Sequence, residues 1–225
     1  MEKDFIPIAQ TGHDEMVIVS STKATNWKTI DDLIAAAKKT PGKMKFATSA
    51  PTSSTRIVFE AFSKMVGMKL VMVPFKGSAP ACIAVAGGHL PLICAAVSEA
   101  LPHVKRGDML PLLMMGDKRA KEFPDCPTAQ EKGWDFNMST WHVLFAPKGI
   151  SPQIVAKIES IAKKLVDDKD YQAAMDAIGS KAVFKTGKDF AKYWKSEREK
   201  MGALIMEIGI VLAPESPDVF RRLSG

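Results

Sequence analysis

The sequence predicts an α/β fold with a largely parallel sheet. Short apolar runs alternate along the chain with segments of helical spacing, and the links between them are short. In STRIVFEAFSKMVG, for example, apolar residues recur at Ile57, Val58, Ala61, Phe62 and Met65, which is the spacing of one helix face. No internal repeat and no low-complexity tract interrupts the alternation, and the length is enough for one large domain or two small lobes.

The first half of the chain alternates most regularly. Thr29 is expected to cap a helix, with Asp32 three residues on as an approximate capping box, and Pro41-Gly42 stops that helix. Gly67 stops the next one. The expected strands are 16–21, 44–49, 69–75, 90–96 and 110–116. The expected helices are 29–39, 54–67 and 78–88, and 98–108 is expected to form a short helix and a turn.

The second half begins with an irregular polar stretch at 116–135, in which KEFPDCPTAQEKG is expected to form a loop and a short helix. A long strand follows at 136–147, and long strands can cross between lobes. Ser151 caps and Pro152 opens the next helix. The remaining expected elements are helices at 152–168, 170–179 and 189–210, a strand at 181–186 and an irregular tail.

The composition is that of an ordinary globular protein, with a formal net charge of +6 and a pI of about 9.1. A basic balance favours anionic partners of some kind. The charges alternate in sign along helical segments such as KIESIAKKLVDDKD and KSEREK, a pattern typical of solvated helix faces. No aromatic residues are interleaved with the basic ones, so we expect no nucleic-acid partner.

Metal binding and membrane insertion are not indicated. The cysteines, Cys82, Cys94 and Cys126, are odd in number and form no CxxC, and apolar neighbours favour buried thiols for the first two. The histidines are scattered, and no apolar run reaches the length of a membrane span. The first residues lack a basic segment followed by an apolar one, so no signal peptide is expected.

Catalytic motifs are also missing from the sequence. It holds no G-x-S-x-G elbow, no P-loop and no G-x-G-x-x-G. A hydrolase or lyase that uses His142 or His103 with a nearby serine remains an alternative, but the sequence does not place these residues together. We therefore expect a binding protein, not an enzyme.

Three segments carry the candidate binding residues. Thr48–Thr55 is rich in hydroxyls where a strand turns into a helix, and a helix start suits either an N-cap or an anion. Val73–Ala81 is a second such turn, in which Gly77 allows a tight bend and Ser78 can cap. The third is the strand around Trp141. Parallel α/β sheets bind ligands at the carboxyl ends of their strands, which favours a binding role for the first two segments over a purely structural one.

Several separated blocks carry a resemblance to a known family. In order they are PIAQTG with VIVSS, WKTIDDLIAAAKKTPGKMKFATS, VPFKGSAPA, SEALPHVKRGDMLPLLMMGDKRAKEFPDCPTAQEKG and TWHVLFAPKGISPQIVAKI. Their order and spacing resemble the substrate-binding proteins of tripartite tricarboxylate transporters, also called Bug proteins. The resemblance runs from about Asp4 to about Ile210. It departs from the family at Ala50 and Thr52, which replace glycines, and at Phe75, which replaces a tyrosine.

The resemblance implies a two-lobed periplasmic-binding-protein-like fold of type II that closes on a small carboxylate. One lobe would hold residues 22–140 and the other residues 1–21 and 144–225, joined by hinge strands near 16–21 and 140–147. The partners would be the carboxylate and the membrane subunits of the transporter, in the periplasm, with no metal or organic cofactor. The implied ligand-binding residues, on the two loops and the strand described above, are Ser49, Ser53, Ser54, Thr55, Lys76, Gly77, Ser78 and Trp141.

The start of the chain matches a point well inside the family's pattern, after the first strand–loop–helix unit of full-length members. We therefore expect an incomplete second lobe and self-association through the surface that it leaves open. The alternative is a truncated or degenerate paralogue that keeps the fold without binding a transport ligand.

Overall fold

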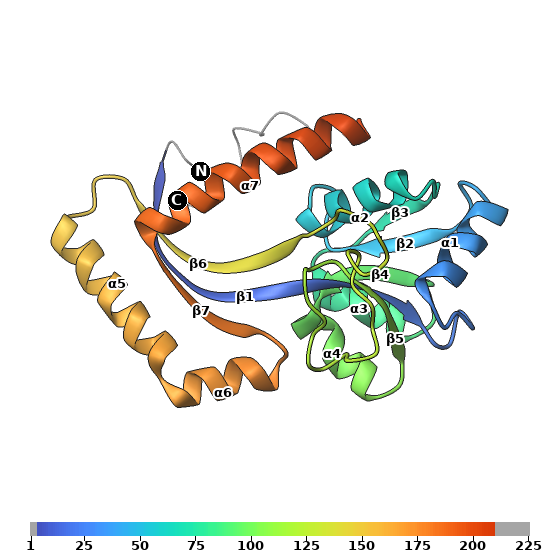
Figure 1. The fold of residues 1–225 in the computed structure, drawn as a ribbon, viewed down its shortest axis with the longest axis horizontal. Coiled ribbons are helices and arrows are strands. Elements are labelled where there is room, and N and C mark those ends of the chain that lie inside the picture. The colour runs from blue at the N-terminus through green and yellow to red at the C-terminus, as the bar shows by residue number, and fades with distance from the viewer. Residues whose placement is uncertain (1–3, 210–225) are drawn as a thin grey trace.

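The organising element of the computed structural model, which describes residues 4–209, is the long strand β1 (Phe5–Ser21). One half of β1 pairs antiparallel with β6 and β7, and the other half, from Met16 on, pairs antiparallel with β4 and β5. This strand therefore runs through both lobes (Figure 1). The strand expected at 16–21 is only its last part, so the predicted start was wrong.

The first part of β1 was not recognised as a strand in the sequence, because that segment contains polar residues. Gln10, Asp14 and Glu15 are 1%, 3% and 5% exposed. Gln10 Nε2 donates to the nearby Gly12 O at 3.0 Å. Partners from distant elements make the burial of the two acids tolerable: Ser98 Oγ donates to Asp14 Oδ2 at 2.6 Å, and Lys181 Nζ lies 3.2 Å from Glu15 Oε1. Such partners are invisible to a local pattern, which shows only polar side chains.

The first lobe surrounds the second half of β1. Its elements are α1 (Ile30–Lys39), β2 (Lys45–Thr48), α2 (Ser54–Met65), β3 (Val71–Pro74), α3 (Ser78–Ala86), β4 (Leu92–Ala96), α4 (Val97–Lys105) and β5 (Met109–Met114). The strand order is β3-β2-β4-β1-β5. Only β2 pairs parallel, with β3 and with β4, whereas every pairing of β1 is antiparallel. The expected largely parallel sheet is thus a mixed one, because β1 enters from the other lobe against the direction of its neighbours.

Two apolar cores cover the two faces of the first-lobe sheet. Met16 and Ile18 face a core formed with α1 and α2, and Val17 and Val19 face a core formed with α3 and α4. This is the alternation that a strand imposes on successive side chains. Helices on both faces explain why the second half of β1 reads as an unbroken apolar run.

The second lobe surrounds the first half of β1. Its elements are β6 (Ser139–Pro147), α5 (Pro152–Asp167), α6 (Lys169–Ala177), β7 (Lys181–Thr186) and α7 (Gly187–Ile208). The strand β6 is shorter than the expected 136–147, because Met138 N–H donates to Met115 O in the first lobe at 2.7 Å before the ladder with β1 begins. Part of the lobe's apolar surface is exposed, at Leu144, Ile154, Ile161, Leu165 and Ile178.

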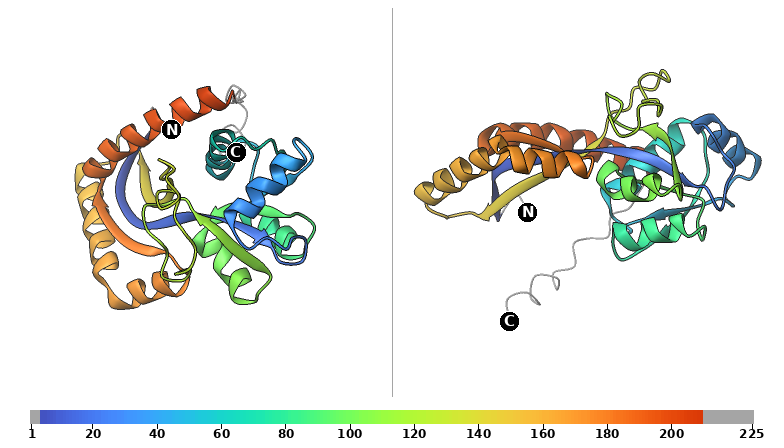
Figure 2. Two further views of the ribbon diagram at one scale, coloured as in Figure 1. Left: turned by 45° about the vertical axis from the view of Figure 1, so that its right-hand side comes forward. Right: turned by 90° about the horizontal axis from the view of Figure 1, so that it is seen from below.

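The helix α7 connects the two lobes. It begins against β1 in the second lobe and ends against α2 in the first, as both Figure 1 and the left view in Figure 2 show. Met201, Leu204 and Ile208 pack against the α1/α2 core of the first lobe. The last helix therefore closes one side of the space between the lobes.

Several local predictions are confirmed. Thr29 forms the full capping box with Asp32, and Ser151 caps α5. Ser53, which the sequence analysis named only as a binding residue, is the cap of α2. Ser78, by contrast, is the first residue of α3 and not its cap, which is Gly77. The short helix expected within 116–135 is absent, since that stretch is a series of turns. The expected irregular tail lies outside the described residues.

The three cysteines are buried and unpaired, and burial raises the pKa of each thiol to about 12. In the part of the chain that the structure describes, no helix combines the length and the apolar character needed to cross a membrane.

Candidate functional site

The loop that leads into α2 uses most of its hydroxyls internally. Ser53 Oγ accepts from the N–H of Arg56 and lies 2.8 Å from Thr48 Oγ1 and 3.1 Å from Thr55 Oγ1. Ser49 Oγ lies 3.4 Å from Thr55 Oγ1. The side chain of Ser54, in contrast, is exposed at the first position of the helix. Among the predicted binding residues of this loop, Ser54 is therefore the one best placed to reach a ligand.

The second candidate loop lies directly beside the first. Phe75 N–H donates to Thr48 O and Gly77 N–H donates to Ser49 O, both at 2.8 Å. Gly77 has a φ of 116°, a backbone conformation that favours glycine, and it caps α3 with its backbone alone. Lys76 is exposed. The two loops thus form one surface at the carboxyl ends of β2 and β3.

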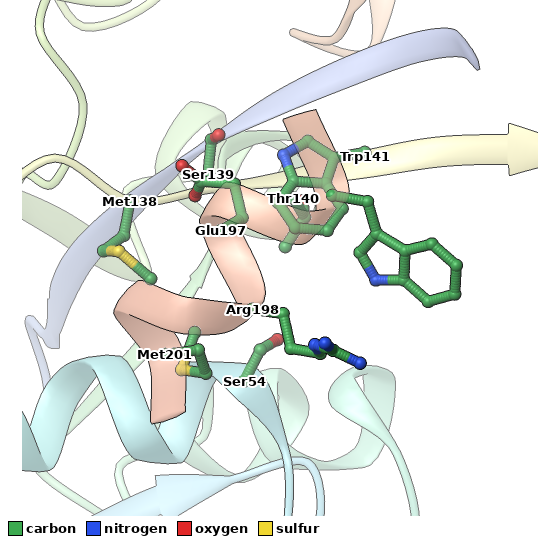
Figure 3. A pocket seen from close by; sticks show the side chains of 9 residues that line it. Ser54, Met138, Ser139, Thr140, Trp141, Glu197, Arg198 and Met201 are labelled. Atoms are coloured by element: carbon green, nitrogen blue, oxygen red, sulfur yellow. The ribbon is translucent and has the colours of Figure 1, made fainter. Parts of the chain in front are cut away.

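A cavity of about 380 Å³ lies between the first turn of α2, the start of β6 and one face of α7. This volume is within the usual range of ligand pockets, about 300–1,000 Å³. Figure 3 shows the side chains around it. The lining residues are Ser54, Met138, Ser139, Thr140, Trp141, Trp194, Glu197, Arg198 and Met201.

This cavity brings together Ser54 and Trp141, two of the predicted binding residues, although they come from different lobes. The loop residues Lys76, Gly77 and Ser78 do not line it. They meet the α2 loop instead, through the Gly77–Ser49 hydrogen bond.

Trp141 forms one wall of the cavity and is held in place by α7. Its Nε1–H donates to Tyr193 Oη at 3.1 Å, and its ring packs edge-on against Tyr193 and Phe190 at 5.4 and 5.7 Å between centroids. Phe190 belongs to an aromatic cluster that also includes Phe145 and Trp194. The indole is thus fixed in orientation and half-buried, with one part of its surface left for the cavity.

The cavity residues on α7 were missed in the sequence, where KSEREK was interpreted as a solvated face. Trp194, Glu197, Arg198 and Met201 recur at intervals of three and four, so they share one face of the helix. That spacing was a usable signal that the four act together. It does not reveal what the face covers, because the partner, α2, lies far away in the sequence.

The charges of the cavity lie on neighbouring residues of α7. Glu197 is 7% exposed, and Lys200 Nζ lies 2.7 Å from its Oε1. Burial, followed by the nearby Glu197 carboxylate, raises the pKa of Tyr193 above its ordinary value. Arg198 adds a guanidinium beside Ser54 (Figure 3).

In the part of the chain that the structure describes, the histidines considered as catalytic bases do not contact a serine nucleophile. His142 Nε2 lies 3.4 Å from Asp14 Oδ2, and the same oxygen accepts from Ser98 Oγ. The carboxylate therefore stands between the histidine and the serine, whereas nucleophilic catalysis requires direct contact between those two. His103 Nδ1 lies 2.7 Å from an Arg106 nitrogen, and partial burial followed by Arg106 lowers the pKa of His103. Within residues 4–209, no group of three or more potential ligands is arranged to hold a metal ion.

Comparison with known proteins shows to which family the chain belongs. Residues 1–210 match the family model described as the tripartite tricarboxylate transporter family receptor. The chain belongs to this family. The resemblance found in the sequence is thereby confirmed, together with the two-lobed α/β binding-protein fold.

Among curated relatives of this receptor family, the protein BugT of Bordetella pertussis is 28% identical over 211 residues, which cover 93% of this chain and 64% of BugT. The chain therefore spans less than two thirds of the length of that relative.

Solved structures show the same fold at low identity. A protein of R. palustris solved with adipate has a TM-score of 0.87 at 22% identity, covering 92% of this chain and 70% of that one. MatC from Rhodopseudomonas palustris, solved with bound malate, has a TM-score of 0.81 at 21% identity, covering 89% of this chain and 69% of that one.

Proposed function

We propose that this chain is an extracytoplasmic solute-binding protein that captures a small carboxylate for a tripartite tricarboxylate-type transporter. The observation that carries the proposal is the cavity in which Ser54, at the start of α2, faces Trp141 and α7 from the other lobe. A ligand held there touches both lobes, so binding favours their closed arrangement. Membership of the receptor family and the adipate and malate bound by structurally similar proteins support this role.

The ligand carboxylate would lie at the first turn of α2. The N–H groups of that turn have no acceptor within the helix, and the helix start carries partial positive charge. The exposed hydroxyl of Ser54 adds a donor, and Thr55, Ser53 and Ser49 hold the loop in shape through their mutual hydrogen bonds. Lys76, Gly77 and Ser78 complete the adjacent surface, where they support the α2 loop.

Closure would take place about the two strands that cross between the lobes, near 16–21 and 140–147. The moving bodies would be residues 22–140 on one side and residues 1–21 with 144–225 on the other. In the periplasm, the closed form would then be recognised by the membrane subunits of the transporter. No metal or organic cofactor takes part in this scheme.

The alternative, a paralogue that keeps the fold without binding a transport ligand, is favoured by a different observation. The hydroxyls of Ser49, Ser53 and Thr55 already bond to one another and to the backbone, so the loop is complete as a helix cap. Exposed apolar side chains such as Ile154 and Ile161 in the second lobe also leave a surface open for self-association.

Calorimetric titration of the chain with a panel of small carboxylates separates the two. We expect saturable binding that weakens in Ser54→Ala/Thr55→Ala. The lost Ser54 hydrogen bond to the charged carboxylate costs about 1.5–3 kcal/mol, and the loop also loses the Thr55 hydrogen bonds that hold it in shape. The matched control is Ser151→Ala, which removes a cap hydroxyl at α5, outside the cavity. No binding by the parent, or equal binding by the double variant and the parent, would favour the alternative.

A further inference from the structure

The cavity between α2, β6 and α7 has chemically different ends. At one end, Arg198 extends beside Ser54 at the start of α2 (Figure 3). At the other end, Glu197 extends toward Ser139 on β6 (Figure 3). Because consecutive helix residues point about 100° apart, α7 presents the cation and the carboxylate to separate parts of the same cavity. The result is one end suited to an anion and one end where a carboxylate, that of Glu197, already lies with its counter-charge, Lys200.

The positive end matches a carboxylate in geometry as well as charge. A guanidinium presents its donors in a planar fork that can engage both oxygens of a carboxylate. The Ser54 hydroxyl lies on the same side of the cavity and supplies a further donor. This pairing depends on α7 reaching α2, which the packing of Met201 and Leu204 against the first-lobe core ensures.

The walls between the two ends are mostly apolar and flat. Trp141 and Trp194 contribute indole rings, and Met138 and Met201 contribute thioethers. Ring faces pack favourably on other rings, and methionine sulfur makes favourable contacts with aromatic groups. Trp141 is already oriented by Tyr193, so a ligand ring would meet a surface that does not have to be ordered first.

The negative end limits the ligand to one carboxylate. Glu197 is 7% exposed, and Lys200, at 2.7 Å from its Oε1, already serves as its counter-charge. A second ligand carboxylate at this end would be desolvated without a counter-charge of its own, because Lys200 is already engaged by Glu197, and this is unfavourable. In a dicarboxylate too short to reach this end, the second carboxylate would lie against the apolar indole and thioether walls, which is also unfavourable.

We infer that the ligand of this cavity is an aromatic monocarboxylate, with its carboxylate on Arg198 and Ser54 and its ring between the tryptophan and methionine walls. This inference rests on the proposed function, since it names the class of carboxylate that the chain captures. Glu197 then acts as the specificity-determining residue that disfavours dicarboxylates.

The test is calorimetric titration of the 225-residue chain with benzoate and phenylacetate beside malate and adipate. We expect the aromatic acids to bind at least tenfold more tightly than either dicarboxylate. Arg198→Gln should weaken the aromatic acids at least tenfold. The matched control, Arg106→Gln at the C-cap of α4, removes an exposed arginine paired with Asp108 and should change their affinity less than twofold.

Glu197→Gln should raise the affinity for adipate relative to benzoate at least fivefold, because it releases Lys200 as a counter-charge for the second carboxylate. Trp194→Leu, which keeps an apolar wall but removes the ring, should weaken benzoate more than adipate. Circular dichroism of each variant verifies that the fold is retained.

Tighter binding of malate or adipate than of the aromatic acids would overturn this inference and leave the proposed function standing. Binding of no carboxylate at all would overturn both. Equal affinity of Arg198→Gln and the parent for benzoate would also contradict the placement of the carboxylate.

Discussion

The start of helix α7 leaves no room for a side chain at Gly187. A Cβ there would lie 2.2 Å from the carbonyl oxygen of Pro7 and 2.9 Å from that of Ile8, both on β1. The N–H of Gly187 also donates to Glu159 Oε2 at 2.9 Å. Gly187→Ala can therefore be accommodated only if the helix start moves away from β1, which stretches that hydrogen bond and loosens the base of α7.

We expect Gly187→Ala to lower the free energy of unfolding by about 2–4 kcal/mol. Overpacking alone costs about 1–3 kcal/mol, and weakening a hydrogen bond to a charged acceptor adds part of about 1.5–3 kcal/mol. Gly202 in the same helix is the matched control, since a Cβ there meets nothing within 4 Å. Gly202→Ala should raise stability by about 0.5–1 kcal/mol through helix propensity.

Urea unfolding followed by circular dichroism measures both variants against the parent. The two midpoints should move in opposite directions although the substitutions are chemically identical. If Gly187→Ala unfolds at the parent's midpoint or above it, α7 is not seated on β1 as described, and the cavity that α7 forms with α2 loses its support.

Three further outcomes follow from the described contacts. Ser53→Ala should destabilise the chain by about 1 kcal/mol in the same unfolding assay, because it removes the side-chain cap of α2. An unchanged unfolding midpoint would mean that the hydroxyl network adds nothing to the free energy of unfolding. Burial, only partly offset by Glu15, lowers the pKa of His13 from 6.5, so the unfolded chain binds a proton more readily than the folded chain. The melting temperature should therefore fall as the pH drops below about 6.5. An equal fall in the variant His13→Gln would show that another group causes the effect. Ile154→Lys/Ile161→Lys should reduce the self-association measured by sedimentation velocity, because these apolar side chains are 50% and 56% exposed. An unmodified chain that is monomeric at all concentrations would contradict this prediction.

The local elements were largely predictable because their signals lie within a few residues. Thr29 and Ser151 are caps that the sequence shows directly, and the apolar spacing of α2 matches its buried face except at Met65, which is 44% exposed. The length of β1 was not predictable in the same way. Its buried Asp14 and Glu15 are stabilised by Ser98 and Lys181, which lie 84 and 166 residues away.

The residues of the candidate site were likewise predictable only where their sequence signals are local. The hydroxyl-rich loop and Trp141 stood out in the sequence, because a strand end feeding a helix and a mid-strand tryptophan are local features. Glu197 and Arg198 did not, because their helix also carries the alternating charges of a solvated face. Only the packing of α7 on α2 turns these two residues toward a cavity.

The central claim is that a carboxylate is held between the lobes, in the cavity formed by α2, β6 and α7. The most direct measurement is a crystal structure of the chain with the carboxylate that it binds most tightly by calorimetry. We expect the ligand carboxylate within hydrogen-bonding distance of Ser54 Oγ and its body in contact with Trp141. A carboxylate bound elsewhere, with this cavity empty, would contradict the claim.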